Sequence, residues 1–363
     1  MGRCTGKKVS NPIPILCIGC GSMGSSHVRA YHEMAGFKII GLVDRNPEVT
    51  ARLSAELGGL PQFEDFDQAL EATHPGAVSI STYPDTHARY ALAAMRRGCH
   101  VFVEKPLAES VADAQAVADL AKATRRKVLV GYILRVHPAW QKFIELARTL
   151  GKPLVMRMNL NQQTSGSAWL WLKHLMENMS PLVDCGVHYV DIMCQMTGAK
   201  PVSVHAIGAR LTGELIPGMY NYGQLQITYD DGSVGWFEAG WGPMISEEAF
   251  FIKDVIGPLG CVSIVTAAGQ GTSSNLEAHT RTNRLRLHHA QLDGEGQYAA
   301  PDEFFDMTDE PKHQDLCDRE QAYFLRAIQE DLDLSDHLRD AVNSLRIVLA
   351  ADQSFRCGEV VHL

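Results

Sequence analysis

The sequence has little of three things, and each shortage narrows what the protein can be. No stretch approaches the roughly 20 consecutive apolar residues that a membrane-spanning helix needs, so we expect no membrane segment. Positive charge is in the minority, with 33 Lys and Arg against 42 Asp and Glu, and the net charge of −9 argues against nucleic acid or an anionic membrane as the main partner. Repeats and low-complexity segments are also lacking. The overall composition, with 45% hydrophobic and 21% charged residues, is typical of a globular protein in water.

Cysteine is present, but its pattern does not predict disulfides. The nine cysteines are scattered and odd in number, and five of them lie in apolar runs where a free thiol acts as a small core residue. Cys17 and Cys20 form a C-x-x-C pair, for which a redox or metal role is the less favoured alternative, because the first lies in a predicted strand and the second in a glycine turn. The stretch Met1–Asn11 is polar and lacks the apolar core of a signal peptide. We therefore expect a protein of the reducing cytoplasm.

A chain of 363 residues is too long for one typical core, and its pattern divides it in two. Residues 1–134 alternate apolar runs with amphipathic segments, which predicts βαβ units and a doubly wound, parallel Rossmann sheet. These strands are continuously apolar, as expected where helices cover both faces of a sheet. We predict strands at 13–18, 37–43, 77–81, 99–103 and 127–132, helices at 22–34, 47–57, 85–97 and 109–124, and a weaker unit at 62–72.

Residues 135–363 follow a different pattern. Strand-like runs between 201 and 289, divided by turns such as 230–232, predict an α+β domain with a large, open, mostly antiparallel sheet. One face of that sheet must be exposed to solvent or covered by a partner. We also predict strands at 153–162 and 359–363, helices at 138–150, 180–197, 312–330 and 335–355, and long loops at 270–282 and 293–311.

The loop after the first predicted strand has the composition of a dinucleotide-binding turn. Its sequence G-C-G-S-M-G stands between a strand and a helix, with Ser22 and Met23 inside the motif. Gly19 makes the tight turn, Gly21 lets the backbone approach a pyrophosphate, and Gly24 lets the helix pack on the strand. The N–H groups that begin the helix would then face the phosphates. This context favours a dinucleotide site over a glycine turn that only packs.

Asp44 ends the second predicted strand, where an acidic side chain can accept hydrogen bonds from a ribose diol. Its negative charge would repel the 2′-phosphate of NADP and so favours NAD. The next residue, Arg45, acts in the other direction, because an arginine there can stack on adenine or receive a 2′-phosphate. We expect NAD as the cofactor, with NADP as the alternative.

Lys105 follows Glu104 at the end of the fifth predicted strand, in the triplet E-K-P. Ligands of open α/β sheets bind at the carboxyl ends of the strands, so we expect this lysine near the reactive end of the cofactor. An ammonium group there can hydrogen-bond a hydroxyl and stabilise developing alkoxide charge. The residues alone leave it equally open that the triplet is an ordinary turn with a solvated lysine.

A second group of polar residues lies on the helix that Ser180 and Pro181 are predicted to begin, as N-cap and first helical residue. Asp184, His188 and Asp191 are spaced i, i+4 and i+7, so they share one face of this helix. An imidazole between two acids suits proton transfer. A solvated polar face and a divalent metal site remain as alternatives, although no further ligand pattern supports a metal.

These motifs resemble, in their order and approximate spacing, those of the Gfo/Idh/MocA oxidoreductases, which include glucose-fructose oxidoreductase and inositol dehydrogenases. The resemblance rests on G-C-G-S-M-G at 19–24, E-K-P at 104–106 and D-C-G-V-H at 184–188. It extends over nearly the whole chain, and 130–138 is similar to the family's link between domains. Three motifs in order are far more specific than any one of them.

The resemblance implies a reaction and roles for three residues. A hydride would pass between nicotinamide and a hydroxyl-bearing carbon of a sugar, an inositol or a related polyol. Lys105 would orient and polarise that hydroxyl, and His188 would be the general base that takes or returns its proton. Asp184 would bind substrate or keep the other two in register. Asp191 is expected to anchor the helix.

The resemblance also points to residues around the expected site. Ser81, Tyr83 and His87 follow the fourth predicted strand, where the family places groups near the nicotinamide, and Glu104 is counted with these cofactor contacts. Arg135 could reach an anionic group of the substrate, or could form a salt bridge between domains.

One departure from the family bears on the substrate. Residues 178–181, Asn-Met-Ser-Pro, stand where family members often carry two glycines, which predicts a differently shaped pocket. Trp169 and Trp171, with Lys173 and His174, could wall that pocket because tryptophan faces stack on sugar rings, although buried tryptophan is commoner as core.

The same residues leave two other functions open. An NAD-dependent glycosidase that works by transient oxidation is the second hypothesis, and a cofactor-binding sensor without catalysis is the third. The presence of both Lys105 and His188 counts against the sensor.

Apolar alternation at 223–229 and 234–241 fits a sheet face that packs against another subunit, as is common in this family, so we expect a homodimer or homotetramer.

Overall fold

The structure is a computed structural model, which describes residues 11–248, 250–265 and 272–363. It divides into unit 1, which runs to Gly131 and includes Gln314–Leu338, and unit 2, which comprises Tyr132–His313 and Arg339–Leu363. The predicted boundary after residue 134 lies close to this division. The segment 314–338, however, was predicted in the second domain and belongs to unit 1, because helix α11 (His313–Gln329) stacks Phe324 on Phe37 in the core of that unit.

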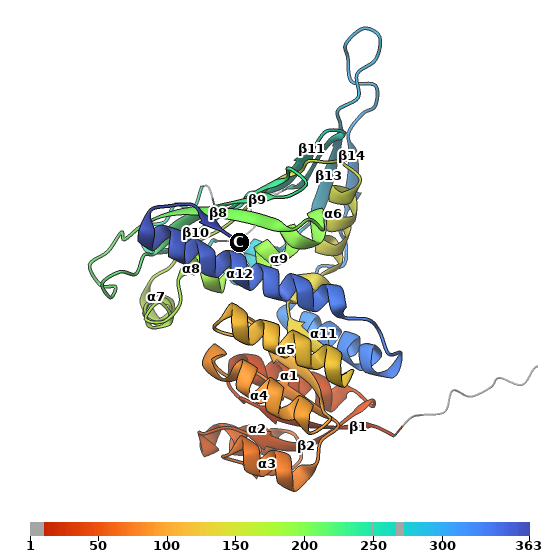
Figure 1. Ribbon diagram of the computed structural model, residues 1–363, viewed down its shortest axis with the longest axis vertical. Coiled ribbons are helices and arrows are strands. Elements are labelled where there is room, and N and C mark those ends of the chain that lie inside the picture. The colour runs from red at the N-terminus through yellow and green to blue at the C-terminus, as the bar shows by residue number, and fades with distance from the viewer. Residues whose placement is uncertain (1–10, 249, 266–271) are drawn as a thin grey trace, which may run out of the picture. The chain divides into compact units, whose positions relative to one another are not determined.

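Unit 1 contains a six-stranded parallel sheet in the order β3-β2-β1-β4-β5-β6, with helices around it (Figure 1). The order reverses between β1 and β4, which is the switch point where dinucleotides bind in such folds. Every helix and strand predicted in residues 11–131 is confirmed to within two residues, and the strands are β1 (Ile13–Ile18), β2 (Phe37–Val43), β3 (Gln62–Phe63), β4 (Ala77–Ile80), β5 (His100–Glu104) and β6 (Val128–Gly131). The helices are α1 (Ser22–Glu33), α2 (Pro47–Glu56), α3 (Phe66–Thr73), α4 (Pro84–Arg96), α5 (Val111–Thr124) and α11.

Unit 2 contains a nine-stranded sheet in the order β14-β13-β12-β11-β7-β10-β9-β8-β15, in which, among the described residues, only β7 and β10 pair in parallel. Its strands are β7 (Val155–Gln163), β8 (Pro201–Ala209), β9 (Tyr222–Tyr229), β10 (Val234–Gly242), β11 (Lys253–Gly257), β12 (Gly260–Val265), β13 (Arg284–His289), β14 (Glu303–Asp306) and β15 (Val361–His362). This confirms the predicted α+β unit with a large, mostly antiparallel sheet. Helices pack on one face of it (Figure 1), namely α6 (Pro138–Arg148), α9 (Gly186–Thr197) and the part of α12 (Ser335–Cys357) after Leu338.

Some elements of unit 2 differ from the prediction. Helix α7 (Gly166–Leu175) was not predicted, and α10 (Leu276–Thr280) and β14 lie in segments predicted as loops; residues 270 and 271 of the first loop lie outside the described residues. The helix predicted at 180–197 is divided into α8 (Pro181–Asp184) and α9, with Cys185 between them. Among the helices that the structure describes, none has the length and apolar content required to span a bilayer.

Candidate active site

The glycine loop between β1 and α1 has the shape that a dinucleotide requires. Gly19 has a φ of 82°, and a Cβ there would lie 2.3 Å from the carbonyl oxygen of Ser81. A Cβ on Gly24 would lie 1.8 Å from the carbonyl oxygen of Gly19, so both glycines are needed for the turn itself. A Cβ on Gly21, in contrast, would meet no atom within 4 Å. Gly21 therefore leaves open space at the N-terminus of α1, where a pyrophosphate can approach the N–H groups of Ser22 and Met23.

Asp44 lies directly beside this loop. Its Oδ2 accepts the backbone N–H of Cys20 at 2.8 Å, and its Oδ1 accepts the backbone N–H of Asn46 at 2.9 Å. Each carboxylate oxygen keeps a second lone pair that could accept a ribose hydroxyl. The next residue, Arg45, is exposed. The open space at Gly21 and this acid together fit a bound dinucleotide.

The C-x-x-C pair, with Cys17 in β1 and Cys20 in the glycine loop, is buried and not in a reactive setting. Cys17 and Cys20 are both buried free thiols. Burial, with a smaller contribution from the charge of Asp44, raises the pKa of Cys20 to about 12, and burial also raises the pKa of Cys17. Thiols with such pKa values are protonated at neutral pH and react poorly. Nothing in this geometry supports the redox alternative.

The three candidates after β4 lie in different surroundings. Ser81 lies under the glycine loop, with its Cβ 3.2 Å from a Cβ built on Gly24. His87 is fully buried, and its Nδ1 lies 2.7 Å from the carbonyl oxygen of Pro106, while burial lowers the pKa of its imidazole. Tyr83 is 67% exposed. Ser81 and His87 thus shape the loops at the carboxyl edge of the sheet, and Tyr83 is accessible to a ligand.

Lys105 follows directly on β5 and is partly buried. The preceding Glu104 is only 7% exposed, and its Oε1 lies 2.7 Å from Nε2 of His27 on α1. Its Oε2 accepts the backbone N–H of Lys105 at 3.2 Å. His27 was not singled out from the sequence, because nothing in the pattern of an amphipathic helix distinguishes it from an ordinary core residue.

In unit 2, Ser180 begins the helical segment that presents Asp184 and His188. Its Oγ accepts the N–H of Val183 at 3.2 Å and Pro181 follows at the first helical position, which confirms the predicted cap. Asp184 and His188 are both partly buried. The His188 ring lies 5.9 Å from the Tyr132 ring and almost perpendicular to it. An acid and an imidazole that are neither fully buried nor fully exposed can meet a substrate and exchange a proton.

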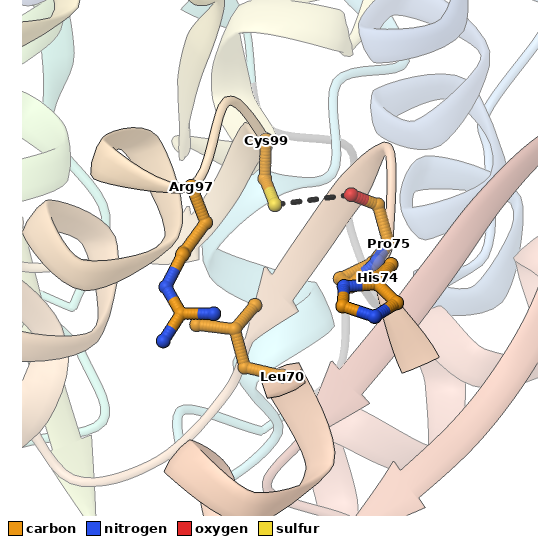
Figure 2. A pocket seen from close by; sticks show the side chains of 5 residues that line it. All are labelled: Leu70, His74, Pro75, Arg97 and Cys99. Carbon is orange, nitrogen blue, oxygen red and sulfur yellow. Dashed lines mark hydrogen bonds between the residues drawn. The ribbon is translucent and has the colours of Figure 1, made fainter. Parts of the chain in front are cut away.

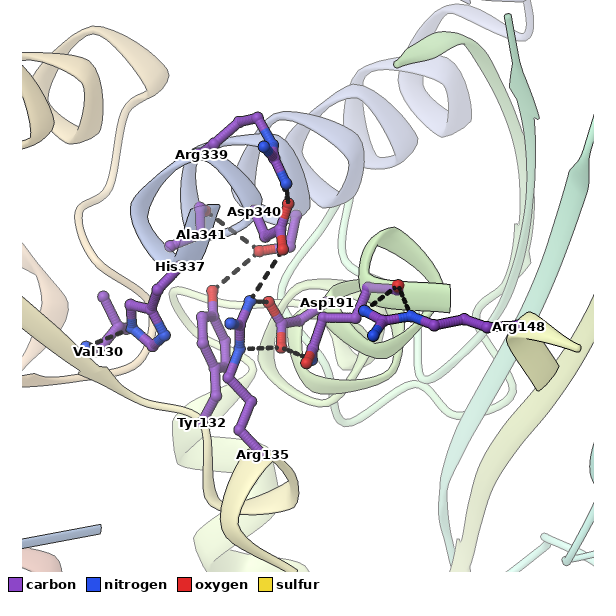
Figure 3. A network of polar contacts seen from close by, with 11 residues as sticks. Val130, Tyr132, Arg135, Arg148, Asp191, His337, Arg339, Asp340 and Ala341 are labelled. Carbon is purple, nitrogen blue, oxygen red and sulfur yellow. Dashed lines mark hydrogen bonds and ion pairs between the residues drawn. The ribbon is translucent and has the colours of Figure 1, made fainter. Parts of the chain in front are cut away.

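Arg135 lies between two carboxylates of unit 2 (Figure 3). Its Nε and Nη2 donate to the two oxygens of Asp191 at 2.8 and 2.5 Å, and Nη2 lies 3.4 Å from Asp340. The Asp191 side chain is 1% exposed. Burial raises the pKa of Asp191, and the guanidinium opposes that rise. This ion cluster joins the short 3₁₀ segment η1 (Ile133–Val136) to α9 and α12, and the guanidinium faces carboxylates of the protein itself.

The substrate-site candidates on α7 differ in their exposure to solvent. Trp169 is 7% exposed. The ammonium of Lys173 lies 5.6 Å from the Trp169 ring centroid and also pairs with Glu214. Trp171 is 60% exposed. His174 is largely exposed and its Nδ1 lies 3.1 Å from Glu177. Trp169 is therefore part of the packing of α7, whereas Trp171 and His174 are open to a ligand.

A small pocket of about 100 Å³ lies at the other edge of the parallel sheet (Figure 2). It is lined by residues that precede β4 and β5, and the Cys99 thiol lies 3.1 Å from the carbonyl oxygen of Pro75. Ligands of this fold bind at the carboxyl ends of the strands, so this pocket is not the cofactor site. The pocket is lined by Leu70, His74, Pro75, Arg97 and Cys99.

Across the described residues, no three His, Cys, Asp or Glu side chains are grouped to hold a metal ion.

Comparison with known proteins agrees with this geometry. The 4-carboxy-2-hydroxymuconate-6-semialdehyde dehydrogenase of Sphingobium sp. is 29% identical over 209 residues, which are 55% of this chain and 64% of that protein. The scyllo-inositol 2-dehydrogenase (NAD(+)) of Bacillus subtilis is 29% identical over 231 residues, or 61% of this chain and 65% of that protein. The chain thus matches somewhat less than two thirds of each relative's length.

The whole fold is shared with solved structures of low sequence identity. The scyllo-inositol dehydrogenase from Lactobacillus casei with bound NAD(H) and scyllo-inositol has a TM-score of 0.75 at 19% identity, over 97% of this chain and 99% of that chain. Residues 142–249 match the C-terminal domain model of the Gfo/Idh/MocA proteins, and residues 13–132 match their model described as an oxidoreductase family with an NAD-binding Rossmann fold. The chain belongs to the Gfo/Idh/MocA oxidoreductase family.

Proposed function

We propose that this protein is an NAD-dependent dehydrogenase or reductase that acts on a hydroxyl-bearing carbon of a sugar, an inositol or a related polyol. The observation that carries the proposal is the glycine loop, which is open at Gly21 and has the Asp44 carboxylate beside it. The inositol dehydrogenase among its relatives supports the polyol class, and NADP stays possible because Arg45 is exposed next to the acid.

The residues of the chain would bind, orient and move a proton. A bound nicotinamide accepts or donates the hydride. We assign Lys105 to hold the reacting hydroxyl and to stabilise negative charge on its oxygen. His188 would take the hydroxyl proton in oxidation and return it in reduction. Asp184, one helical turn before His188, would hydrogen-bond the substrate or the imidazole.

The other candidates receive more specific roles from their surroundings. Arg135 is best assigned to holding α9 through Asp191, because its guanidinium already faces two carboxylates. Trp171 and His174 are proposed as substrate contacts because they are exposed on α7, and Tyr83 as a contact near the nicotinamide because it is exposed after β4. Ser81, His87 and Glu104 would support the cofactor by shaping the loops around it.

An absorbance screen at 340 nm tests the proposal. NAD and then NADP would be offered with a panel of polyols, inositols, aldoses and glycosides. A substrate that produces NADH establishes the dehydrogenase and its substrate class. No signal across the panel, with NAD binding shown separately by fluorescence, would favour the glycosidase or the sensor instead.

We further propose a homodimer or homotetramer in the cytoplasm. The sheet face of unit 2 that the helices leave open presents apolar side chains, and a groove of about 280 Å³ lies on it between β7, β9 and β10. Free cysteines among the described residues, most of them buried, suit a reducing compartment. Sedimentation at micromolar concentration would show a dimer or larger, and a monomer alone would contradict the proposal. The apolar residues of this face are Val155, Val202, Ile207, Val234 and Ile256, which are 38 to 54% exposed.

A further inference from the structure

A buried chain of hydrogen bonds within unit 1 ends at the backbone of Lys105. The phenol of Tyr31 donates to Oε1 of Gln321 at 2.5 Å, and Nε2 of Gln321 lies 2.9 Å from Nδ1 of His27. Nε2 of His27 lies 2.7 Å from Oε1 of Glu104, whose Oε2 accepts the Lys105 N–H. Tyr31, His27 and Gln321 are each 0% exposed. Helix α11 thus reaches the end of β5 through His27, which is 294 residues distant from Gln321 in sequence.

The donors and acceptors along this chain of hydrogen bonds determine which atom carries each proton. The Tyr31 phenol is also hydrogen-bonded to Ser79, and burial raises its pKa well above the ordinary value, so it keeps its proton. Because Oε1 of Gln321 can only accept, the phenol proton points to it, and the amide N–H of Gln321 points to Nδ1 of His27. His27 must then carry its proton on Nε2 and donate it to Glu104. The result is an imidazole that donates from Nε2 and a Glu104 whose two carboxyl oxygens both accept.

A second acid nearby does not share this charge. Glu320 on α11 is 3% exposed, and burial together with the negative charge of Glu104 raises the pKa of Glu320 well above its ordinary value. Burial likewise raises the pKa of the Cys317 thiol, with Glu320 and Glu104 contributing in the same direction. Both shifts favour the neutral forms of Glu320 and Cys317, whereas Glu104, one residue before Lys105, accepts hydrogen bonds at both carboxyl oxygens, as an anion does.

The position of the Glu104 carboxylate is also fixed by packing. Glu104 pairs with Gly131 across β5 and β6, and a Cβ on Gly131 would lie 3.2 Å from the carboxyl carbon of Glu104. On the other side, the His27 ring packs edge to face on Phe102, with centroids 4.7 Å apart. The carboxylate is enclosed between a bare backbone and an imidazole, so it has little freedom to turn.

We propose that His27 and Gln321 are positioning residues for the reaction, which hold Glu104 as an oriented anion and through it fix the strand end that carries Lys105. This inference rests on the proposed role of Lys105. Neither residue is required to touch substrate or cofactor. A fixed negative charge beside the lysine favours its charged form, and a fixed backbone places its ammonium where the hydroxyl must be polarised.

Two variants test the inference through activity. His27→Phe keeps the ring contact with Phe102 but removes the donor to Glu104, and Gln321→Met keeps the volume of the side chain but removes both of its hydrogen bonds. Each should lower kcat/KM by about 10- to 100-fold, the scale of a misplaced catalytic group, and shift the pH profile of kcat. Affinity for NAD, measured by fluorescence titration, should fall less than kcat/KM, because the glycine loop and Asp44 are left unchanged. Ser54→Ala is the matched control, because it removes the hydrogen bond from the buried Ser54 to the Leu60 carbonyl oxygen in the same unit and should leave kcat unchanged.

A measurement without turnover keeps the inference testable if either variant folds poorly. In wild-type protein labelled with ¹⁵N-histidine, the ring-nitrogen shifts of His27 should report the neutral form protonated at Nε2. Gln321→Glu offers only acceptors to Nδ1 and should convert His27 to the doubly protonated form. An Nδ1-protonated or already charged His27 in the wild type would overturn the inference.

The outcomes separate this inference from the proposed function. If Lys105→Ala is nearly as active as the wild type, the role of Lys105 is wrong whatever the His27 variants do. If Lys105→Ala is inactive while folded His27→Phe and Gln321→Met retain wild-type kcat and pH profile, the role of Lys105 stands and the positioning role is rejected.

Discussion

The Oδ2 atom of Asp44 accepts the backbone N–H of Cys20 at 2.8 Å, inside the glycine loop. The acid at the end of β2 is therefore linked to the turn between Gly19 and Gly21 before any cofactor binds. One residue connects the part of the site that would hold the ribose to the part that would hold the pyrophosphate. Changing Asp44 should thus affect both contacts.

We predict that Asp44→Ala weakens NAD binding by about 10- to 100-fold, because hydrogen bonds to a charged group contribute about 1.5–3 kcal/mol. NADP binding should weaken less, since the loss of the negative charge favours its 2′-phosphate. Fluorescence titration with NADH and NADPH measures both. Asp67→Ala is the control, because Asp67 is exposed and pairs with Arg89 on the surface. Unchanged NAD affinity in Asp44→Ala would remove the acid from the cofactor site.

Replacing either proposed catalytic residue should abolish most turnover. We predict that Lys105→Ala and His188→Ala each lower kcat by at least about 100-fold, the scale of a proton-transfer group, while NAD still binds. Steady-state rates on the substrate found at 340 nm, with NAD titrations alongside, measure both effects. Lys38→Ala and His32→Ala, which alter exposed residues of unit 1, are the controls. Near-normal activity in either test variant rejects the role of that residue.

The sequence predicted well those features whose cause is local. The turn at Gly19–Gly24 needs its glycines because a Cβ would collide with the neighbouring backbone, and the cap at Ser180 needs only the residues beside it. Continuous apolar runs likewise identified the strands of the parallel sheet. In each case the residues that enforce the conformation are a few positions apart.

Features that depend on distant partners were not predictable in this way. The pattern of 312–330 indicates an amphipathic helix but not which sheet it covers, so α11 was placed in the wrong unit. A role for His27 could be inferred only from its contacts with Glu104 and Gln321, which lie far from it in the sequence. For Arg135 the sequence left open a contact with the substrate or a salt bridge between domains, whereas the structure pairs it with Asp191 and Asp340 of its own unit.

The ion cluster of Arg135 leads to a prediction about stability. Arg135→Met removes a cation that the buried Asp191 and Asp340 share, so we expect a loss of about 3–5 kcal/mol in the free energy of unfolding. The double variant Arg135→Met with Asp191→Asn should recover part of this loss, because it also removes a buried charge. Urea denaturation measures both variants.

A nearby arginine provides the control for this experiment. Arg339 also pairs with Asp340, at 3.0 Å, but its side chain is 52% exposed. Arg339→Met should therefore cost less than about 1 kcal/mol. Equal losses in Arg135→Met and Arg339→Met would show that burial does not set the strength of this cluster.

Lys253 in unit 2 leads to a prediction about pH. It is 2% exposed, its ammonium lies 4.5 and 5.0 Å from the ring centroids of Phe251 and Tyr189, and it donates to the carbonyl oxygen of Asn159. Burial lowers its pKa from 10.5 to about 7. Between these values the unfolded chain holds a proton that the folded chain has lost, so this residue makes the protein more stable as pH rises from about 7.

We predict that the free energy of unfolding of the wild type, minus that of Lys253→Met, rises between pH 7 and 9 by up to about 1.4 kcal/mol per pH unit. The difference is the quantity to measure, because buried cysteines and tyrosines with raised pKa values act in the opposite direction as the pH approaches 9, and their effects cancel between the two proteins. Urea denaturation at several pH values measures it. Lys38→Met, at an exposed position, should give a flat difference from the wild type, and an equally flat line for Lys253→Met would mean that Lys253 stays charged in the folded protein.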